Sequence, residues 1–213
     1  MRFFLIFLTL SLAQSHWLFA QEKKDVIGFR IGRSTTDITF GEVPHASVGF
    51  FGSLMGPGYS FSGDGFEFAL TKELNRHVYF DLAFSNFSGD GNRGNVNNGK
   101  NIYTLYGYQI PLTINYLTRK DSNRFRVNLG AGFQFIKARL QQYQTITTIT
   151  GSITTRTTDI HITEIQLALK PGVQFRIIPD LFVAFMAQAA IAPNGRFSDN
   201  VCLSLRYIFR KKE

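Results

Sequence analysis

The pentapeptide Phe-Ser-Gly-Asp-Gly occurs twice in this sequence, at residues 61–65 and again at residues 87–91. Each copy carries one aspartate, Asp64 in the first and Asp90 in the second. Two carboxylates at one rim of a fold would share a divalent cation, but calcium takes six to eight oxygen ligands. Asp-Gly pairs also form turns without any ligand. Asp64 and Asp90 are therefore weak metal candidates, and no other metal or cofactor site is indicated.

Histidines are the next residues that could do chemistry at neutral pH. Beyond the N-terminal segment they are His45, His77 and His161. His161 lies three residues from Glu164, and an odd spacing on a regular strand sends two side chains to opposite faces. These positions do not bring a nucleophile and a base together. We therefore expect no enzymatic activity.

Several segments alternate apolar residues with residues that are charged, small or amide-bearing, and these charges are of both signs. Successive side chains of a strand point to opposite faces, so each charge falls on the face away from the apolar residues. Buried charges need partners. We predict a charge network inside the protein formed by Arg30, Glu67, Asp81, Arg126, Glu164, Lys170, Arg176 and Arg206. The alternative is that the surplus of cations lines a narrow pore for small anionic solutes.

Two-faced segments of this kind position the charges. The last one has Val201, Leu203, Leu205, Tyr207 and Phe209 on one face and polar residues on the other, and we expect it to close the fold. The same pattern predicts strands near 26–33, 66–71, 78–85, 102–117, 125–135, 164–177, 181–191 and 200–209. Pro111 lies inside the fourth strand, where it cannot donate a ladder hydrogen bond, and predicts a bulge or a kink there.

The connections between these strands alternate between long and short. The expected loops or turns cover 34–65, 73–77, 86–101, 118–124, 145–158, 178–180 and 192–199. The stretch 145–158 is rich in threonine and isoleucine, which favour extended backbone, and predicts a protruding hairpin that continues two strands. Short turns on one side and long loops on the other are typical of membrane barrels whose two ends lie in the periplasm.

The N-terminus has the regions of a secretion signal. Arg2 precedes the apolar run Phe3 to Leu12, and Ala20 supplies a small residue for cleavage, so residues 1–20 are expected to be removed. The apolar run is too short to cross a membrane as a helix. Residues 21–213 then form a single domain, and its one cysteine, Cys202, excludes an intrachain disulfide.

The fold class follows from the pattern of strands and connections. We predict an all-β protein: an eight-stranded antiparallel up-and-down transmembrane β-barrel with short periplasmic turns and longer extracellular loops. The mean hydropathy near zero agrees with this, because lipid-facing and lumen-facing residues cancel in the average. An eight-stranded barrel has an interior only wide enough for its own side chains.

The strand Tyr108 to Tyr116 resembles a conserved strand of the Gram-negative outer-membrane β-barrel family of porin-like or PorT-like proteins. The strands 128–133 and 203–209 are also similar to that family. Two features depart from the pattern: Gln109 replaces an acid, and the residues 210–213 follow the terminal aromatic. The resemblance implies a barrel integral to the cell outer membrane, and its PorT-like members suggest an accessory role in a protein secretion machine.

The net charge of +8 indicates anionic partners, and for an exported barrel these are lipopolysaccharide and other outer-membrane lipids. Lys137 and Arg139 continue the outward register beyond Phe135, so their stems would snorkel toward lipid phosphates. We expect a structural, adhesion-like or surface-binding role through the extracellular loops, with a protein partner there. The barrel-assembly machinery is the expected partner during insertion, and nothing indicates nucleic acid.

Overall fold

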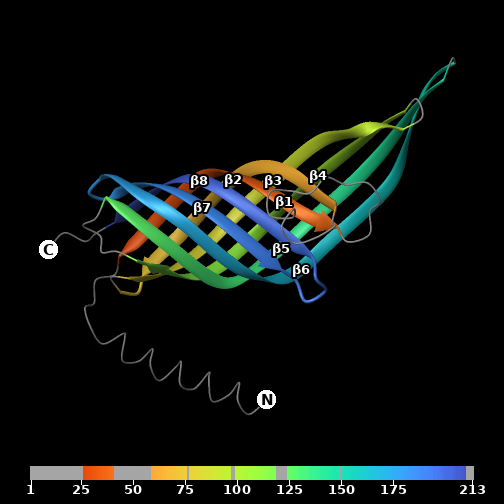
Figure 1. The fold of residues 1–213 in the computed structure, drawn as a ribbon. Helices are drawn as coiled ribbons and strands as arrows, with labels where there is room; N and C mark the ends of the chain where they lie inside the picture. Colours follow the sequence, from red (N-terminus) through yellow and green to blue (C-terminus); the bar gives the residue numbers. More distant parts are fainter. Residues whose placement is uncertain are drawn as a thin grey trace, which may run out of the picture.

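Eight antiparallel strands form a closed ring in sequence order (Figure 1). This computed structural model describes residues 26–40, 59–75, 77–96, 99–118, 124–148 and 150–209. The strands are β1 (Ile27–Phe40), β2 (Tyr59–Glu73), β3 (Val78–Val96), β4 (Gly99–Leu117), β5 (Phe125–Thr148), β6 (Gly151–Ile178), β7 (Leu181–Ile191) and β8 (Phe197–Phe209). The predicted fold class is confirmed. The expected signal segment, residues 1–20, and His45 lie outside the described residues.

The ring closes between its first and last strands. β8 pairs with β1 from Phe209 opposite Ile27 to Ser198 opposite Ile38. The described chain therefore begins and ends at the same end of the barrel (Figure 1). No helix in the described part of the chain has the length and apolar character to cross a bilayer.

The alternation of faces follows the sequence closely. On β5, Leu129 is 59 % exposed while its neighbour Asn128 is fully buried. Exposed apolar residues surround the barrel in the same way on the other strands. On β4 this apolar band runs from Tyr106 to Tyr116, which for tilted strands corresponds to a height of about 25 Å. The predicted outward register is confirmed.

The described parts of two expected long loops are strand, at 34–40 and 59–65 and at 86–96 and 99–101, which corrects the prediction for these residues. β3 and β4 continue to Val96 and from Gly99, with a register shift between Asn92 and Asn95. Asparagine and glycine disfavour strands, but here the extensions of β3 and β4 pair with each other, and that of β4 also pairs with β5. The hairpin predicted at 145–158 is confirmed: β5 and β6 continue past Gly99, the first residue of β4, which pairs with Ile146, and they form the far tip in Figure 1.

Pro111 makes neither the bulge nor the kink that its lack of an N–H predicts. Leu82 lies opposite Leu112 and Ser85 opposite Gln109, so the register is the same on both sides of the proline. The ladder to β3 skips the residues between these pairs, while Pro111 pairs with Gln134 on the other side. The missing donor is thus absorbed by a short gap in one ladder, and the strand stays regular.

Candidate functional site: a filled lumen and a charged rim

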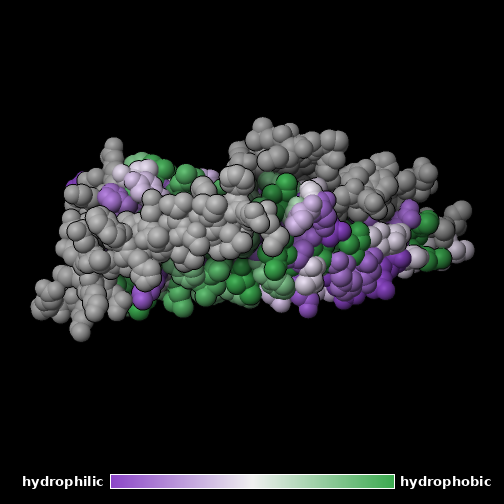
Figure 2. Space-filling view, turned by 90° about the horizontal axis from the view of Figure 1, so that it is seen from below, coloured by the Kyte–Doolittle hydropathy of each residue, from purple (hydrophilic) through white to green (hydrophobic). Residues whose placement is uncertain are grey.

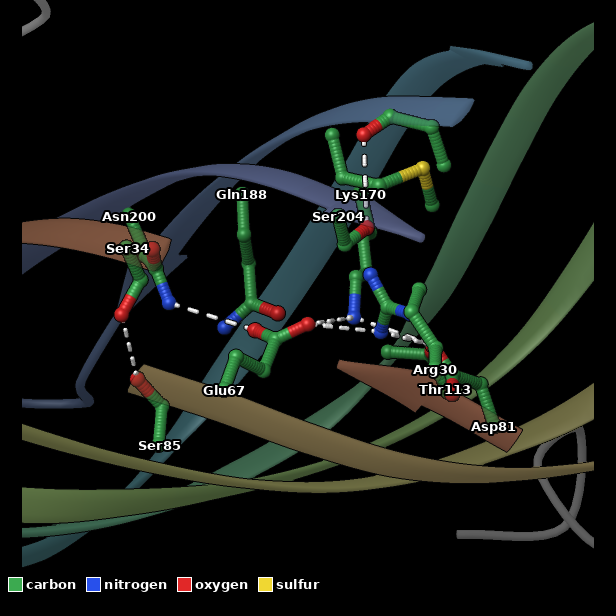
Figure 3. A network of polar contacts seen from close by, with 12 residues as sticks. Arg30, Ser34, Glu67, Asp81, Ser85, Thr113, Lys170, Gln188, Asn200 and Ser204 are labelled. Atoms are coloured by element: carbon green, nitrogen blue, oxygen red, sulfur yellow. Dashed lines mark hydrogen bonds and ion pairs between the residues drawn. The ribbon is translucent and has the colours of Figure 1, made fainter. Parts of the chain in front are cut away.

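Four charged side chains meet in the middle of the lumen (Figure 3). Nη2 of Arg30 lies 2.7 Å from Oε1 of Glu67 and 2.9 Å from Oδ2 of Asp81. Nζ of Lys170 lies 3.0 Å from the same Asp81 oxygen and 3.8 Å from Glu67. All four side chains are at most 2 % exposed. Because two cations face two acids, this quartet carries no net charge.

Two further arginines lie in the lumen toward the turn end. Arg206 and Arg126 both donate to Oε1 of Gln174, at 3.0 Å and 3.3 Å. The guanidinium of Arg126 lies 3.8 Å from the ring centre of Phe182, and that of Arg206 lies 4.3 Å from the ring of Tyr79. Aromatic faces attract cations, so these rings help to accommodate the two charges. Arg206 also lies 3.6 Å from a carboxylate oxygen of Glu73, an acid outside the predicted charge network.

The other two charges of the predicted network lie away from the quartet. Glu164 lies toward the end of the barrel that is away from the short turns. There it accepts hydrogen bonds from Asn194 and Arg196 of the β7–β8 connection. Arg176 lies near the end of β6, where its backbone amide donates to the carbonyl of Arg124. The structure thus distributes the eight predicted residues over separate places along the barrel.

Amides and hydroxyls fill the lumen between these charges. Gln134 donates to Gln166 at 3.1 Å and to Ser198 at 3.0 Å, and it accepts from Gln188. Ser34 of β1 and Ser85 of β3 hydrogen-bond inside the lumen at 3.0 Å (Figure 3). These side chains are buried, as the narrow interior of an eight-stranded barrel requires.

The pattern reverses where the strands extend beyond the apolar band. There the inward side chains are apolar and form one buried cluster, which consists of Ile38, Phe61, Phe87, Leu105, Ile136, Ala138, Leu140 and Ile162. On β5 this cluster alternates with the outward charges of Lys137 and Arg139. Figure 2 shows the matching change on the outside, from a hydrophobic surface to a hydrophilic one along the long axis. The extension is built like a water-soluble barrel, and the band like a lipid-facing one.

The apolar cluster is closely packed. Leu105, Ile136 and Leu140 are fully buried. A Cβ at Gly107 would lie 2.7 Å from Cζ of Phe87, so the absence of a side chain there makes room for the ring. Together with the charged quartet, this packing fills the interior in two successive zones.

A second group of charges lies on the outer surface just beyond the band. Arg139 donates from Nε and Nη2 to the two carboxylate oxygens of Asp159, each at 2.8 Å, and from Nη1 to the hydroxyl of Tyr106 at 2.8 Å. These hydrogen bonds, together with the positive charge of Arg139, hold the pKa of Asp159 well below its usual range. The outward position of Arg139 was predictable from its register, whereas its partner Asp159 was not.

Arg156 and His161 complete this group, which we call the rim cluster: Lys137, Arg139, Arg156, Asp159 and His161. Nη1 of Arg156 lies 2.9 Å from Asp159, and Nε2 of His161 lies 3.3 Å from it. A register shift at Gln142 and Tyr143 allows Arg156 and Asp159, three residues apart, to share a face. His161 thus faces outward, away from Glu164.

The two metal candidates lie on the outside, on neighbouring strands. Asp64 pairs with Ser88 in the β2–β3 ladder, two residues short of Asp90. Asp64 accepts from Thr35 at 2.6 Å and from Arg33 at 3.1 Å, and these contacts lower its pKa. Within the described ranges, no three His, Cys, Asp or Glu side chains gather as a metal site.

The comparisons with known proteins concern the fold. The sequence matches no family model, and no curated protein matches it. OprG, an outer-membrane protein of Pseudomonas aeruginosa, superposes with a TM-score of 0.58 at 11 % identity, over 89 % of this chain and 98 % of OprG. Ail, the attachment invasion locus protein of Yersinia pestis, gives a TM-score of 0.51 at 11 % identity, over 88 % of this chain and 100 % of Ail.

This chain has the fold of the eight-stranded outer-membrane barrels. Neisserial surface protein A has it too, with a TM-score of 0.51 at 12 % identity, over 85 % of this chain and 97 % of that protein. The similarity to an outer-membrane barrel fold agrees with the family resemblance of the sequence. The neighbours give no support to its PorT-like part.

Proposed function

We propose that this chain is an integral protein of the Gram-negative outer membrane that binds at the cell surface through its strand extension, without enzymatic activity. The observation that carries this proposal is the reversal of the side-chain pattern. Exposed apolar residues occupy a band of about 25 Å, the height of the lipid-facing zone of outer-membrane barrels. Beyond it the apolar residues turn inward and the charges outward.

The orientation follows from the same asymmetry. Outer-membrane barrels have short turns on the periplasmic side and longer connections outside. The end with the short connections from β2 to β3, from β4 to β5 and from β6 to β7 also holds both ends of the described chain. We therefore place both termini in the periplasm and the β5–β6 hairpin outside the cell. Insertion is expected to depend on the barrel-assembly machinery, with β8 as the closing strand.

The rim cluster is the proposed contact with lipopolysaccharide. Lys137 is exposed and Arg139 lies just beyond the band, within reach of lipid phosphates. Ail has been solved with the heparin analogue sucrose octasulfate, which shows that a barrel of this fold can present groups that bind a polyanion. Because Arg139 also holds Asp159, Lys137→Glu is the cleaner test. It is expected to lower the thermal stability in membranes with lipopolysaccharide and to leave it unchanged in neutral detergent.

Membrane fractionation tests the proposal as a whole. The folded chain is expected in the outer-membrane fraction and to migrate differently on gels before and after boiling, as closed barrels do. Recovery of folded protein from the soluble periplasm would overturn the proposal.

Two alternatives remain testable beside it. An accessory role in a protein secretion machine, as in PorT-like proteins, requires a stable protein partner, which chemical crosslinking in intact membranes followed by purification would reveal. A narrow solute pore requires an open path, whereas the lumen holds a buried apolar cluster and a buried charge quartet. Planar-bilayer recordings without conductance steps would exclude this second alternative.

A further inference from the structure

The outer half of β6 has a strand neighbour on one side only. β6 pairs with β5 up to Gly151, but its pairing with β7 begins at Leu167. More than half of its 28 residues therefore have no partner in β7, and no other described strand pairs with this side. An open strand edge presents unpaired backbone N–H and C=O groups, which is the usual template for an added strand.

The register shows which backbone groups face the open side. In an antiparallel ladder, one residue pair exchanges two hydrogen bonds and the next pair exchanges none. The amide of Arg176 donates to the carbonyl of Arg124 at 2.7 Å, and the register is unbroken from there to Thr158 opposite Gln142. Even-numbered residues of this part of β6 therefore bond to β5. Asp159, His161 and Thr163 direct their N–H and C=O groups to the open side.

The usable part of this edge has clear limits. Below it, Glu164 is held by Asn194 and Arg196 of the β7–β8 connection. Above it, the register shift at Gln142 and Tyr143 interrupts the regular strand, and bulges of this kind obstruct edge pairing. The regular segment between these limits is Thr158–Thr163, which contains neither proline nor lysine to block pairing.

The two faces of this segment define the chemistry of a partner. On the inner face, Ile162 is buried in the apolar cluster and Ile160 packs against it. On the outer face β6 carries Arg156, Asp159 and His161, and the adjacent β5 carries Arg139 and Lys137, so the rim cluster has a net positive charge. A strand added here would place alternate side chains next to an apolar surface and next to a surface of net positive charge.

We propose that the edge Thr158–Thr163 binds an extended segment of another protein by strand addition, and that this segment alternates apolar and acidic residues. This inference rests on the proposed function, because it needs the extension to be accessible outside the cell. A second copy fits less well: two barrels in one membrane run β6 in the same direction, so self-pairing would be parallel and its hydrogen bonds less stable.

Amide hydrogen exchange of the full chain in lipid nanodiscs tests the proposal. The probe is a nine-residue synthetic peptide that alternates valine and glutamate. Without it, the amides of Asp159, His161 and Thr163 should exchange rapidly, while those of Ile160 and Ile162 are protected by their bonds to β5. A saturating amount of the probe should slow the first three at least tenfold and leave the other two unchanged.

Two matched comparisons isolate the backbone and the charge. His161→Pro removes one N–H from the open edge without removing a bond to β5 and should abolish the effect of the probe, whereas His161→Ala keeps the N–H and should preserve it. A probe with lysine in place of glutamate should protect at least tenfold less. Equal protection by both probes, or an unaltered effect in His161→Pro, would overturn the proposal.

The remaining outcomes are also decisive. Protection of the three amides before any probe is added would show that the edge is already covered, and protection that grows with barrel concentration would show self-pairing. Either result overturns the proposed partner. Failure of the proposed function has a different readout, which is loss of the wild-type chain from the outer-membrane fraction. The two experiments therefore distinguish failure of the proposed function from failure of the proposed strand addition.

Discussion

Arg139 and Asp159 join β5 to β6 through two parallel hydrogen bonds, from Nε to Oδ1 and from Nη2 to Oδ2, each 2.8 Å long. This fork-to-fork geometry is the strongest arrangement for an arginine and a carboxylate. The third donor of Arg139 reaches Tyr106, so the contact extends to β4. It lies where the outer surface changes from apolar to charged and ties together three strands at that point.

The first prediction concerns the pH dependence of this contact. Because Arg139 holds the pKa of Asp159 below its usual range, the carboxylate stabilises the fold above the unfolded-state pKa of about 3.9. That contribution is lost as the pH falls from there toward the folded-state pKa. The difference in unfolding free energy between wild type and Asp159→Asn should be constant above about pH 5 and shrink in more acidic buffer. Urea unfolding in micelles measures it, with the exposed Asp90→Asn as control. A difference that grows with acid would contradict the contact.

The second prediction concerns the lipid-facing band. Leu129 is 59 % exposed near the middle of the apolar stretch of β5, so Leu129→Arg should cost about 2–4 kcal/mol of unfolding free energy in a bilayer. Ile153 is 66 % exposed on the hairpin beyond the band, and Ile153→Arg should change stability by less than about 0.5 kcal/mol. Equal costs at both positions would show that the band is misplaced.

The strand faces were predictable because period-two alternation is a local property. Phe66, Phe68 and Leu70 face outward and Glu67 faces the lumen, as their spacing requires. One slip of register would exchange the two faces of a strand. The sequence therefore determines which side chains enter the lumen, but not which of them meet there.

The extensions of β1, β2, β3 and β4 were not predictable from composition, unlike the β5–β6 hairpin, whose threonine and isoleucine favour strand. Asparagine and glycine predicted a loop at 86–101, although Phe87 continues the inward register of β3. Ile136, Ala138 and Leu140 alternate with Lys137 and Arg139, and this reversed alternation is the signal that would have revealed the extension. Contacts such as Arg156 with Asp159 depend on a register shift that has no sequence signature here.

The third prediction concerns the charge quartet of the lumen. Asp81→Asn leaves Arg30 and Lys170 facing only one acid, Glu67. Removing one partner of a buried ion pair typically costs about 3–5 kcal/mol, because a charge stays uncompensated. Adding Lys170→Met restores the balance of charge and should recover part of that loss. Unfolding free energies of the two single variants and the double variant form the cycle. Strictly additive losses would mean that the quartet does not act as a unit.

The last prediction tests whether the extension has a core of the water-soluble kind. Leu140 is fully buried in the apolar cluster, so Leu140→Ala removes packed methyl groups and leaves a cavity, at a cost of about 2–5 kcal/mol. Ile146 lies further along the same strand and is 46 % exposed, so Ile146→Ala leaves no cavity and should cost far less. Because the proposed position in the membrane leaves this core outside the lipid, the loss in Leu140→Ala should have the same size in a bilayer and in a micelle. The loss in Leu129→Arg, by contrast, should depend on the bilayer. A loss in Leu140→Ala no larger than that in Ile146→Ala would contradict a packed core beyond the band.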